Sequence, residues 1–279
     1  MAGPNANTIT IGGDLTVGRM GFGAMRVTGD GAWGDPPDRA SAIALLRRVV
    51  ERGVTLLDTA DSYGPGTSET LIAEALHPYP KGVVIATKGG LTRPSRNRWD
   101  ANCKPGHLRQ ACEASLTRLK LERIDLYQLH TVDDRVPLAD SVGALVELQK
   151  QGKIRHIGLS NVTTRQLAQA RKLATIVSVQ NRYSLGDRDD GVIAVCAKDG
   201  LAFLPWYPLA AGALVRRGGT LAEIAQRHKA TPAQVALAWL LRRSPVMLPI
   251  PGTSSIAHFE ENLAASGVAL TGAEFAALG

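Results

Sequence analysis

Short apolar runs alternate with longer amphipathic stretches along most of the chain. The apolar runs are long enough for strands and too short for helices, and they predict strands near Met20, Leu57, Ile85, Leu126, Ile157, Val177, Phe203 and Leu248. Apolar residues three and four positions apart predict helices over Asp38 to Glu51, Ser68 to Leu76, Gly106 to Lys120, Leu138 to Gln151, Thr164 to Leu173, Asp190 to Lys198, Thr220 to His228 and Ser255 to Ala265. The pattern therefore predicts eight strands that alternate with eight helices.

This alternation favours an α/β protein with a (β/α)8, or TIM, barrel. Between Asp58 and Ile250 the predicted strand ends are about 32 residues apart on average, which suits one strand and one helix per step. Parallel strands need a right-handed helical crossover, and eight such units close into a barrel. An open doubly wound sheet is the alternative, but no strand–GxGxxG–helix sequence occurs near the N-terminus. Because no linker divides the chain, we expect residues 1–279 to form a single barrel domain.

Two further elements are expected beside the repeating units. Thr8 to Ile11 and Leu15 to Val17 flank two glycines that favour a tight turn, which predicts an N-terminal β-hairpin. An extra helix is predicted over Thr231 to Arg242, before the last strand. Pro232 lies in its first turn, where the missing N–H costs nothing.

Composition argues against several classes of function. The formal net charge is +7, but the 32 basic residues are dispersed, so we expect no nucleic-acid partner. No run of about 18 apolar residues occurs and the N-terminus lacks a signal-peptide pattern, which predicts a soluble cytoplasmic protein without a membrane partner. The three cysteines have no CxxC spacing and no two histidines lie four residues apart, so no disulfide framework or metal site is predicted.

Several of the apolar runs end at an ionisable residue. Asp58, Lys88 and His130 each follow such a run, and Tyr63 lies in the short loop after Asp58. If the strands are successive and parallel, these side chains converge at one rim of the barrel. An ammonium beside a phenol lowers the pKa of the phenol from about 10 towards working pH. The pattern therefore predicts a site that delivers a proton.

At this point the chain resembles the aldo-keto reductases over nearly its whole length. The matching segments, in order along the chain, are Gly53 to Ala60 with Tyr63-Gly64, Lys88, Ser115 to Leu119, Ile124 to His130, Gly152 to Asn161, Gln180 with Tyr183, Pro208-Leu209, Ile250 to Gly252 and Glu261-Asn262. Within the family, Trp33-Gly34 and the run from Gly252 to Ser255 are most similar to the bacterial branch that includes pyridoxal reductases. Such a resemblance implies a catalytic tetrad and a nicotinamide cofactor.

In the implied tetrad, Tyr63 is the general acid in carbonyl reduction and Lys88 lowers the pKa of its phenol. Asp58 holds Lys88, and His130 orients the substrate carbonyl. Taken singly, each of these residues could equally be a structural residue. The four together at matched strand ends favour the catalytic interpretation.

The cofactor contacts implied by the resemblance follow the later strands. Ser160, Asn161 and Gln180 carry side chains able to bind a carboxamide, and Trp206 falls where the family places an aromatic ring against the nicotinamide. The remaining expected cofactor contacts are Gly23, Ala24, Met25, Asp58, Pro208, Leu209, Ala210, Gly212, Ile250, Gly252, Thr253, Ser254, His258, Glu261 and Asn262.

The predicted phosphate site departs from the better-known members of the family. Thr253 and Ser254 precede a helix, whose N–H groups suit a ribose phosphate. However, Gly252 stands where many members carry a lysine, and His258 stands where many carry an arginine for the 2′-phosphate. We expect NADP(H) to be the cofactor, with NAD(H) as the alternative.

The resemblance implies an NADP(H)-dependent oxidoreductase that reduces aldehydes or ketones to alcohols. One alternative is a nucleotide-binding regulatory subunit of the same fold with little turnover. Another is a barrel enzyme that forms a Schiff base through Lys88, but the neighbouring Asp58 would hold that lysine protonated and blunt its nucleophilicity.

The substrate is expected to be a small aldehyde or ketone in an open pocket. The loops expected to close the pocket near the C-terminus are short, so its wall must come mostly from the loops with Trp33 and Trp99, beside Tyr63 and His130. Either tryptophan could instead only anchor its loop by packing. We expect several planar or aromatic aldehydes to be accepted, with pyridoxal among them.

Overall fold

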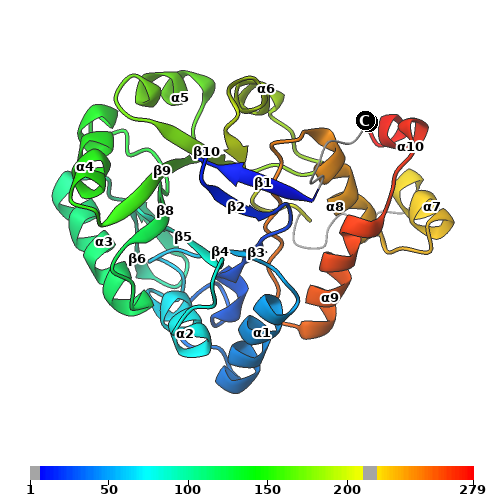
Figure 1. Cartoon of the computed structure of the whole chain (residues 1–279), viewed down its shortest axis with the longest axis horizontal. Coiled ribbons are helices and arrows are strands. Elements are labelled where there is room, and N and C mark those ends of the chain that lie inside the picture. The colour runs from blue at the N-terminus through cyan, green and yellow to red at the C-terminus, as the bar shows by residue number, and fades with distance from the viewer. Residues whose placement is uncertain (1–6, 210–218) are drawn as a thin grey trace.

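The structure, a computed structural model, describes residues 7–209 and 219–279. Figure 1 shows a central ring of strands with helices around it. The strands are β1 (Thr8–Ile11), β2 (Leu15–Gly18), β3 (Phe22–Gly23), β4 (Leu56–Asp58), β5 (Val84–Gly89), β6 (Leu91–Ser95), β7 (Arg98–Ala101), β8 (Ile124–Leu129), β9 (Ile154–Ser160), β10 (Ile176–Gln180) and β11 (Ala202–Phe203). The helices are α1 (Arg39–Glu51), α2 (Thr67–Leu76), α3 (Pro105–Leu119), α4 (Leu138–Lys150), α5 (Thr164–Arg171), α6 (Asp190–Asp199), α7 (Thr220–Arg227), α8 (Pro232–Arg243), α9 (Ile256–Ala264) and α10 (Gly272–Ala277), with short 3₁₀ turns at Ala24–Val27 and Ala265–Gly267.

Seven strands form a parallel sheet in the order β11-β10-β9-β8-β5-β4-β3, and an extended segment between α8 and α9 joins its two edges. On one side the Phe203 N–H donates to the Val246 carbonyl, and the Leu248 N–H donates to the Phe203 carbonyl, each at 2.8 Å. On the other side the Gly21 N–H donates to the Pro249 carbonyl at 2.9 Å. The sheet therefore closes into an α/β barrel.

The first and last positions of this ring differ from the predicted regular strands. The strand expected near Met20 is reduced to the two residues of β3. The segment expected as a strand near Leu248 is extended but is not a regular strand. The physical reason is that Pro249 and Pro251 have no N–H and so cannot donate to a strand ladder.

A hairpin closes the end of the barrel where the strands begin. Strands β1 and β2 pair antiparallel, and Figure 1 shows them lying across the opening of the ring. Ile11, Leu15 and Val17 are buried in the same apolar cluster as Leu126 and Leu248 of the barrel interior. Because this end is filled by apolar side chains, a ligand has to enter from the opposite end.

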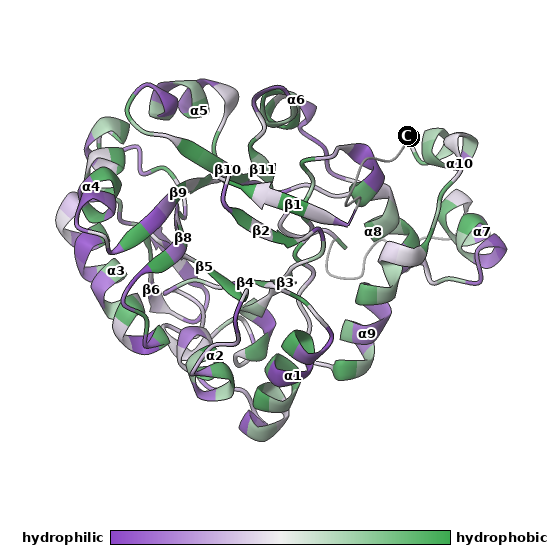
Figure 2. Ribbon diagram, in the orientation of Figure 1, coloured by the Kyte–Doolittle hydropathy of each residue, from purple (hydrophilic) through white to green (hydrophobic). Residues whose placement is uncertain are grey.

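The helices cover the outside of the barrel with their apolar faces inward. In α4, for example, Val142, Leu145 and Leu148 are spaced at helical intervals and are buried in the main core. Figure 2 shows hydrophobic colour along much of the central sheet, whereas the helices carry both hydrophobic and hydrophilic residues. Within residues 7–209 and 219–279, no helix has the length and apolar character needed to cross a membrane.

One hairpin and one helix had no counterpart in the sequence pattern. Strands β6 and β7 form an antiparallel hairpin in the loop after β5, and α10 follows the helix predicted to end at Ala265. The β6–β7 hairpin lies at the carboxyl end of β5, so it contributes to the rim on which the predicted site lies.

Candidate active site

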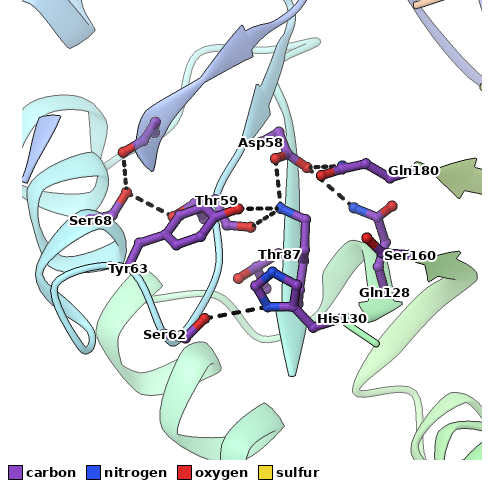
Figure 3. A network of polar contacts seen from close by, with 12 residues as sticks. Asp58, Thr59, Ser62, Tyr63, Ser68, Thr87, Gln128, His130, Ser160 and Gln180 are labelled. Carbon is purple, nitrogen blue, oxygen red and sulfur yellow. Dashed lines mark hydrogen bonds and ion pairs between the residues drawn. The ribbon is translucent and has the colours of Figure 1, made fainter. Parts of the chain in front are cut away.

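Adjacent parallel strands bring the predicted tetrad together. Asp58 is the last residue of β4, Lys88 lies near the end of β5, and His130 directly follows β8. These strands are neighbours in the sheet, in the order β8-β5-β4. Tyr63 lies in the loop between β4 and α2, and Figure 3 shows its ring beside that of His130.

The Lys88 ammonium is the centre of this group. Its Nζ donates to Asp58 Oδ1 at 2.6 Å and to the Thr59 carbonyl at 2.8 Å, and it lies 3.4 Å from the Tyr63 hydroxyl. The His130 ring meets the Tyr63 ring edge-on, with centroids 5.7 Å apart. Lys88 has no exposed surface, so these contacts are made away from bulk water.

The charge states of Lys88 and His130 follow from their surroundings. Burial by itself lowers the pKa of Lys88, but the attraction of Asp58 and Tyr63 outweighs this and raises it above its ordinary value. Burial and the nearby Lys88 ammonium hold the pKa of His130 well below its usual range. At neutral pH, Lys88 is therefore charged and His130 is neutral.

The pKa of Tyr63 differs from the expectation that Lys88 lowers it towards working pH. Lys88 does act in that direction, but burial has the larger effect, and the pKa of Tyr63 is raised above its ordinary value. The expected lowering of the Tyr63 pKa takes account of the neighbouring cation alone, whereas desolvation of the phenol acts in the opposite direction. Tyr63 is therefore a protonated phenol at neutral pH.

The Asp58 carboxylate is held by amide donors in addition to Lys88. Gln180 Nε2 of β10 donates to Asp58 Oδ2 at 2.8 Å, and Gln128 Nε2 of β8 donates to the same oxygen at 3.2 Å. Gln128 was not identified from the sequence. The available signal was an amide side chain two residues before His130, within the strand that ends at Leu129.

Further polar contacts surround the tetrad, at His130 and beside Lys88. Ser62 Oγ lies 3.3 Å from His130 Nδ1, and a dashed line in Figure 3 marks this contact. Thr87, next to Lys88, donates to the buried Glu69 carboxylate of α2 at 2.6 Å. Burial and the nearby Glu69 raise the pKa of the Asp61 carboxyl to about 8. The loop between β4 and α2 therefore contacts His130 through Ser62, and β5 is joined to α2 through Thr87 and Glu69.

A cavity of about 1040 Å³ opens at the carboxyl ends of the strands. The sequence-predicted residues that line it are Gly23, Met25, Asp58, Tyr63, Trp99, His130, Ser160, Asn161, Gln180, Trp206, Pro208, Leu209, Ile250, Gly252, Thr253, Ser254, His258, Glu261 and Asn262. The lining residues that sequence reasoning missed are Arg26, Leu91, Tyr207, Ala233 and Pro251. Its size is at the upper end of the range of about 300–1,000 Å³ for ligand pockets, which suits a large ligand.

Some predicted residues do not line this cavity. Lys88 reaches it only through Asp58 and Tyr63, and Ala24 and Trp33 are also not among its lining residues. Ala210 and Gly212 lie outside the described residues. The Trp33 ring instead lies near the Arg93 guanidinium, with 5.4 Å between the ring centroid and Arg93 Cζ. This contact fits the alternative that Trp33 anchors its loop by packing.

Residues 19–279 match the model of the aldo/keto reductase family. The chain belongs to the aldo/keto reductase family. Among curated relatives of this aldo/keto reductase, an uncharacterized oxidoreductase of Schizosaccharomyces pombe is 48% identical over 98% of the chain and 89% of its own length. Pyridoxine 4-dehydrogenase of Escherichia coli is 44% identical over 96% of the chain and 95% of its own length. This similarity supports the placement in the bacterial branch that includes pyridoxal reductases.

Solved aldo/keto reductase structures share the fold. A glycerol dehydrogenase from Gluconobacter oxydans superposes with a TM-score of 0.90 at 25% identity, covering 99% of this chain and 94% of the other. An aldo/keto reductase from Klebsiella pneumoniae, in complex with NADP and acetate, superposes with a TM-score of 0.83 at 29% identity, covering 98% and 94%. These matches span the barrel and the cavity at its carboxyl end.

The predicted nicotinamide contacts of this aldo/keto reductase are partly engaged with one another. Asn161 Nδ2 donates to the His130 carbonyl at 2.9 Å, and its Oδ1 accepts from Trp206 Nε1 at 2.9 Å. Gln180 donates its amide N–H to Asp58, so its Oε1 is the atom left to accept from a ligand. The Ser160 hydroxyl accepts from Asn161 at 3.2 Å and can still donate. Gln180 and Ser160 therefore offer one acceptor and one donor, the set that a carboxamide needs.

The backbone around Gly23 and Gly252, where the sequence predicts the phosphate site, is very close-packed. A Cβ on Gly23 would lie 2.6 Å from the Ile250 carbonyl oxygen, and one on Gly252 would lie 2.5 Å from the Gly23 carbonyl oxygen. The lysine that many family members carry at the position of Gly252 therefore does not fit this backbone. Thr253, Ser254 and His258 line the cavity beyond this contact.

Proposed function

We propose that this aldo/keto reductase is an NADP(H)-dependent oxidoreductase that reduces aldehydes or ketones to alcohols, with Tyr63 as general acid. The observation that carries the proposal is the Tyr63 hydroxyl, which lies 3.4 Å from a Lys88 ammonium held by Asp58 and lines the same cavity as His130. NADP and NADPH complexes among the solved relatives support the choice of cofactor.

The residues of the cavity fit such a cofactor. Gln180 and Ser160 supply the acceptor and donor for a carboxamide, and the hydroxyls of Thr253 and Ser254 with the Arg26 guanidinium suit phosphate oxygens. When bound, the cofactor supplies the hydride, and the protein positions it.

The proton comes from the protein. Tyr63 is protonated at neutral pH and can donate its hydroxyl proton to a carbonyl oxygen, and the Lys88 ammonium stabilises the phenolate that remains. Neutral His130 lines the same cavity and can donate a hydrogen bond to the carbonyl oxygen, which orients it. The Schiff-base alternative is disfavoured because Lys88 is protonated and paired with Asp58.

The proposed substrates are small planar or aromatic aldehydes. Similarity to the pyridoxine 4-dehydrogenase supports pyridoxal as the first compound to examine. Trp99, Tyr63 and His130 line the cavity with aromatic rings, which suits a flat substrate.

The test is a panel of pyridoxal, methylglyoxal, simple aromatic aldehydes and sugars, followed by the loss of NADPH absorbance. We expect Tyr63→Phe to lower turnover by at least about a hundredfold, the low end for losing a general acid, while NADPH affinity changes only a few-fold. Near-normal turnover in this variant would remove Tyr63 from the mechanism. Tight NADPH binding with no turnover of any compound would favour a regulatory subunit instead.

A further inference from the structure

Arg93 in β6 is a buried arginine whose hydrogen-bond partners are all backbone carbonyls. Its Nη1 donates to the carbonyls of Ala32, at 2.9 Å, and Ser62, at 3.3 Å. Its Nη2 donates to the carbonyls of Gly31, at 3.0 Å, and Arg96. Arg93 is only 8% exposed and forms no ion pair with any carboxylate of the described chain. This guanidinium therefore links three segments: the loop after β3, the loop between β4 and α2, and the β6–β7 hairpin.

The same guanidinium stacks on a tryptophan of the cavity wall. Arg93 Cζ lies 3.6 Å from the centroid of the Trp99 ring. The Trp99 ring in turn meets the Tyr63 ring edge-on, with centroids 6.4 Å apart and an interplanar angle of 76°. Trp99 is 40% exposed and lines the cavity, so part of its ring faces open space. Trp99 therefore lies in contact with both the Arg93 guanidinium and the Tyr63 ring.

Only arginine can make this set of contacts. Its planar fork of five N–H donors binds several carbonyls in one plane, and the flat face of the guanidinium stacks on an aromatic ring. Lysine would keep the charge but would lose both the fork and the stacking surface. A substitution by lysine therefore separates the geometry of Arg93 from its charge.

A further contact connects Arg93 to the substrate-orienting histidine. The Ser62 carbonyl accepts from Arg93, and the Ser62 hydroxyl lies 3.3 Å from His130 Nδ1. The contact with the Ser62 carbonyl is the longest of the hydrogen bonds that Arg93 makes, and it is the Ser62 hydroxyl, not the carbonyl, that faces His130. Of the two aromatic neighbours of Tyr63, only Trp99 is therefore in direct contact with Arg93.

We propose that Arg93 is a positioning residue that fixes Trp99 beside Tyr63 and so builds the wall that receives the aromatic part of a carbonyl substrate. The inference rests on the proposed function, since it assumes that a carbonyl compound binds next to Tyr63. Arg93 itself lies behind this wall and is not among the residues that line the cavity. It determines which substrates bind well and leaves the chemistry of Tyr63 and Lys88 in place.

The test compares Arg93→Lys with the wild-type enzyme on benzaldehyde and propanal, with NADPH as the reductant. We expect the Michaelis constant for benzaldehyde to rise by at least about tenfold, as for the loss of a pocket contact, and that for propanal to change by less than about threefold. The dissociation constant of NADPH should not change. Arg98→Lys is the matched control, because Arg98 is an exposed arginine of the same hairpin that pairs with Asp100 at 2.9 Å.

A double variant identifies the route of the effect. In the Trp99→Leu background, Arg93→Lys should cause no further loss with benzaldehyde, because the ring that it positions is gone. If the two losses multiply, or if Arg93→Lys affects both aldehydes equally, Arg93 does not act through Trp99 and the inference is wrong. If Arg93→Lys does not fold, Trp99→Leu alone must show the same selective loss with benzaldehyde, and an unselective effect overturns the inference.

A binding measurement separates this inference from the proposed function. Calorimetry of benzyl alcohol and 1-propanol with the enzyme–NADP⁺ complex does not require turnover. If no aldehyde is reduced but Arg93→Lys selectively weakens benzyl alcohol binding, the proposed function fails and the role of Arg93 stands. If the wild-type complex binds neither alcohol, or Arg93→Lys weakens both equally, the aromatic wall is overturned.

Discussion

Two effects act on the pKa of the Tyr63 phenol in opposite directions. The Lys88 ammonium lowers this pKa and burial raises it, and burial is the stronger effect. Because its pKa is raised above its ordinary value, the phenol is protonated throughout the neutral range. The pKa of His130 lies well below its usual range, so this ring stays neutral throughout the same pH range. A protonated phenol is the form required to reduce a carbonyl group, whereas alcohol oxidation needs the phenolate as base.

The pH dependence should therefore differ between the two directions. We expect kcat/KM for aldehyde reduction to be flat from about pH 6 to 9 and to fall only at pH values above the ordinary phenol pKa of about 10, because the pKa of Tyr63 is raised. For alcohol oxidation, kcat/KM should rise with pH over the same range. Initial rates in both directions on the NADP(H)-saturated enzyme measure this. A reduction rate that falls with an apparent pKa near 7 would contradict the protonation states assigned here.

The Ser62 hydroxyl can set which nitrogen of the neutral His130 carries the proton. When the Ser62 hydroxyl donates to Nδ1, 3.3 Å away, the proton lies on Nε2, which can then donate to a substrate carbonyl. We expect Ser62→Ala to lower kcat/KM for reduction by roughly tenfold, because one hydrogen bond to the reacting oxygen becomes less populated. Ser62→Thr keeps the hydroxyl and is the control. Equal activity of the two variants would show that Ser62 does not set the tautomer.

At the scale of elements, the sequence located the tetrad because each of its strand positions follows a buried apolar run. Asp58, Lys88 and His130 needed only strand ends and parallel neighbours to be brought together. The β6–β7 hairpin could not be predicted in this way, because it is polar and contains Pro94. It is held by long-range contacts such as that of Arg93, which no local pattern reveals.

The contact between β3 and the segment before α9 gives an element-scale prediction. A Cβ at Gly252 would lie 2.5 Å from the Gly23 carbonyl oxygen, so Gly252→Lys must push these segments apart. We expect weaker NADPH binding and a loss of stability of about 1–3 kcal/mol, typical of overpacking, although the variant restores the lysine of other family members. Thermal unfolding and NADPH titration measure both effects.

The matched control for this variant is Gly143→Ala. Gly143 lies inside α4, and a Cβ there would meet nothing within 4 Å. Alanine should therefore raise stability by about 0.5–1 kcal/mol, because glycine in a helix costs backbone entropy. If Gly252→Lys tightens NADPH binding, the backbone yields more easily than its close contact implies.

At the scale of the whole molecule, the barrel has one closed end and one open end. The β1–β2 hairpin fills the first with apolar side chains, and the cavity of about 1040 Å³ occupies the second. The cavity spans residues from β3 to α9, which are far apart in the sequence. A cofactor in this cavity would therefore contact segments from the beginning and from the end of the chain at once. Because these segments lie together only in the folded protein, the cofactor would bind the folded chain far better than the unfolded one.

Coenzyme binding should thus stabilise the fold, and the extent should depend on the 2′-phosphate. A ligand at a hundred times its dissociation constant adds about 2.7 kcal/mol, and each kcal/mol corresponds to roughly 2–4 °C in Tm for a chain of this size. We expect NADPH to raise Tm by more than the same concentration of NADH, because Thr253, Ser254 and His258 line the cavity with groups that suit a phosphate. Thermal unfolding with each coenzyme measures the difference.

The variant that isolates the phosphate contribution is His258→Leu. The His258 side chain is exposed and its backbone N–H bonds to the Ser255 hydroxyl at 3.4 Å, so the substitution leaves the start of α9 intact. It should reduce the shift caused by NADPH and leave that caused by NADH unchanged, because only NADPH carries the 2′-phosphate. The NADPH shift should also shrink as salt is added, since charges near the surface are screened. A larger shift with NADH would reverse the coenzyme preference, and equal losses for both coenzymes would move His258 away from the 2′-phosphate.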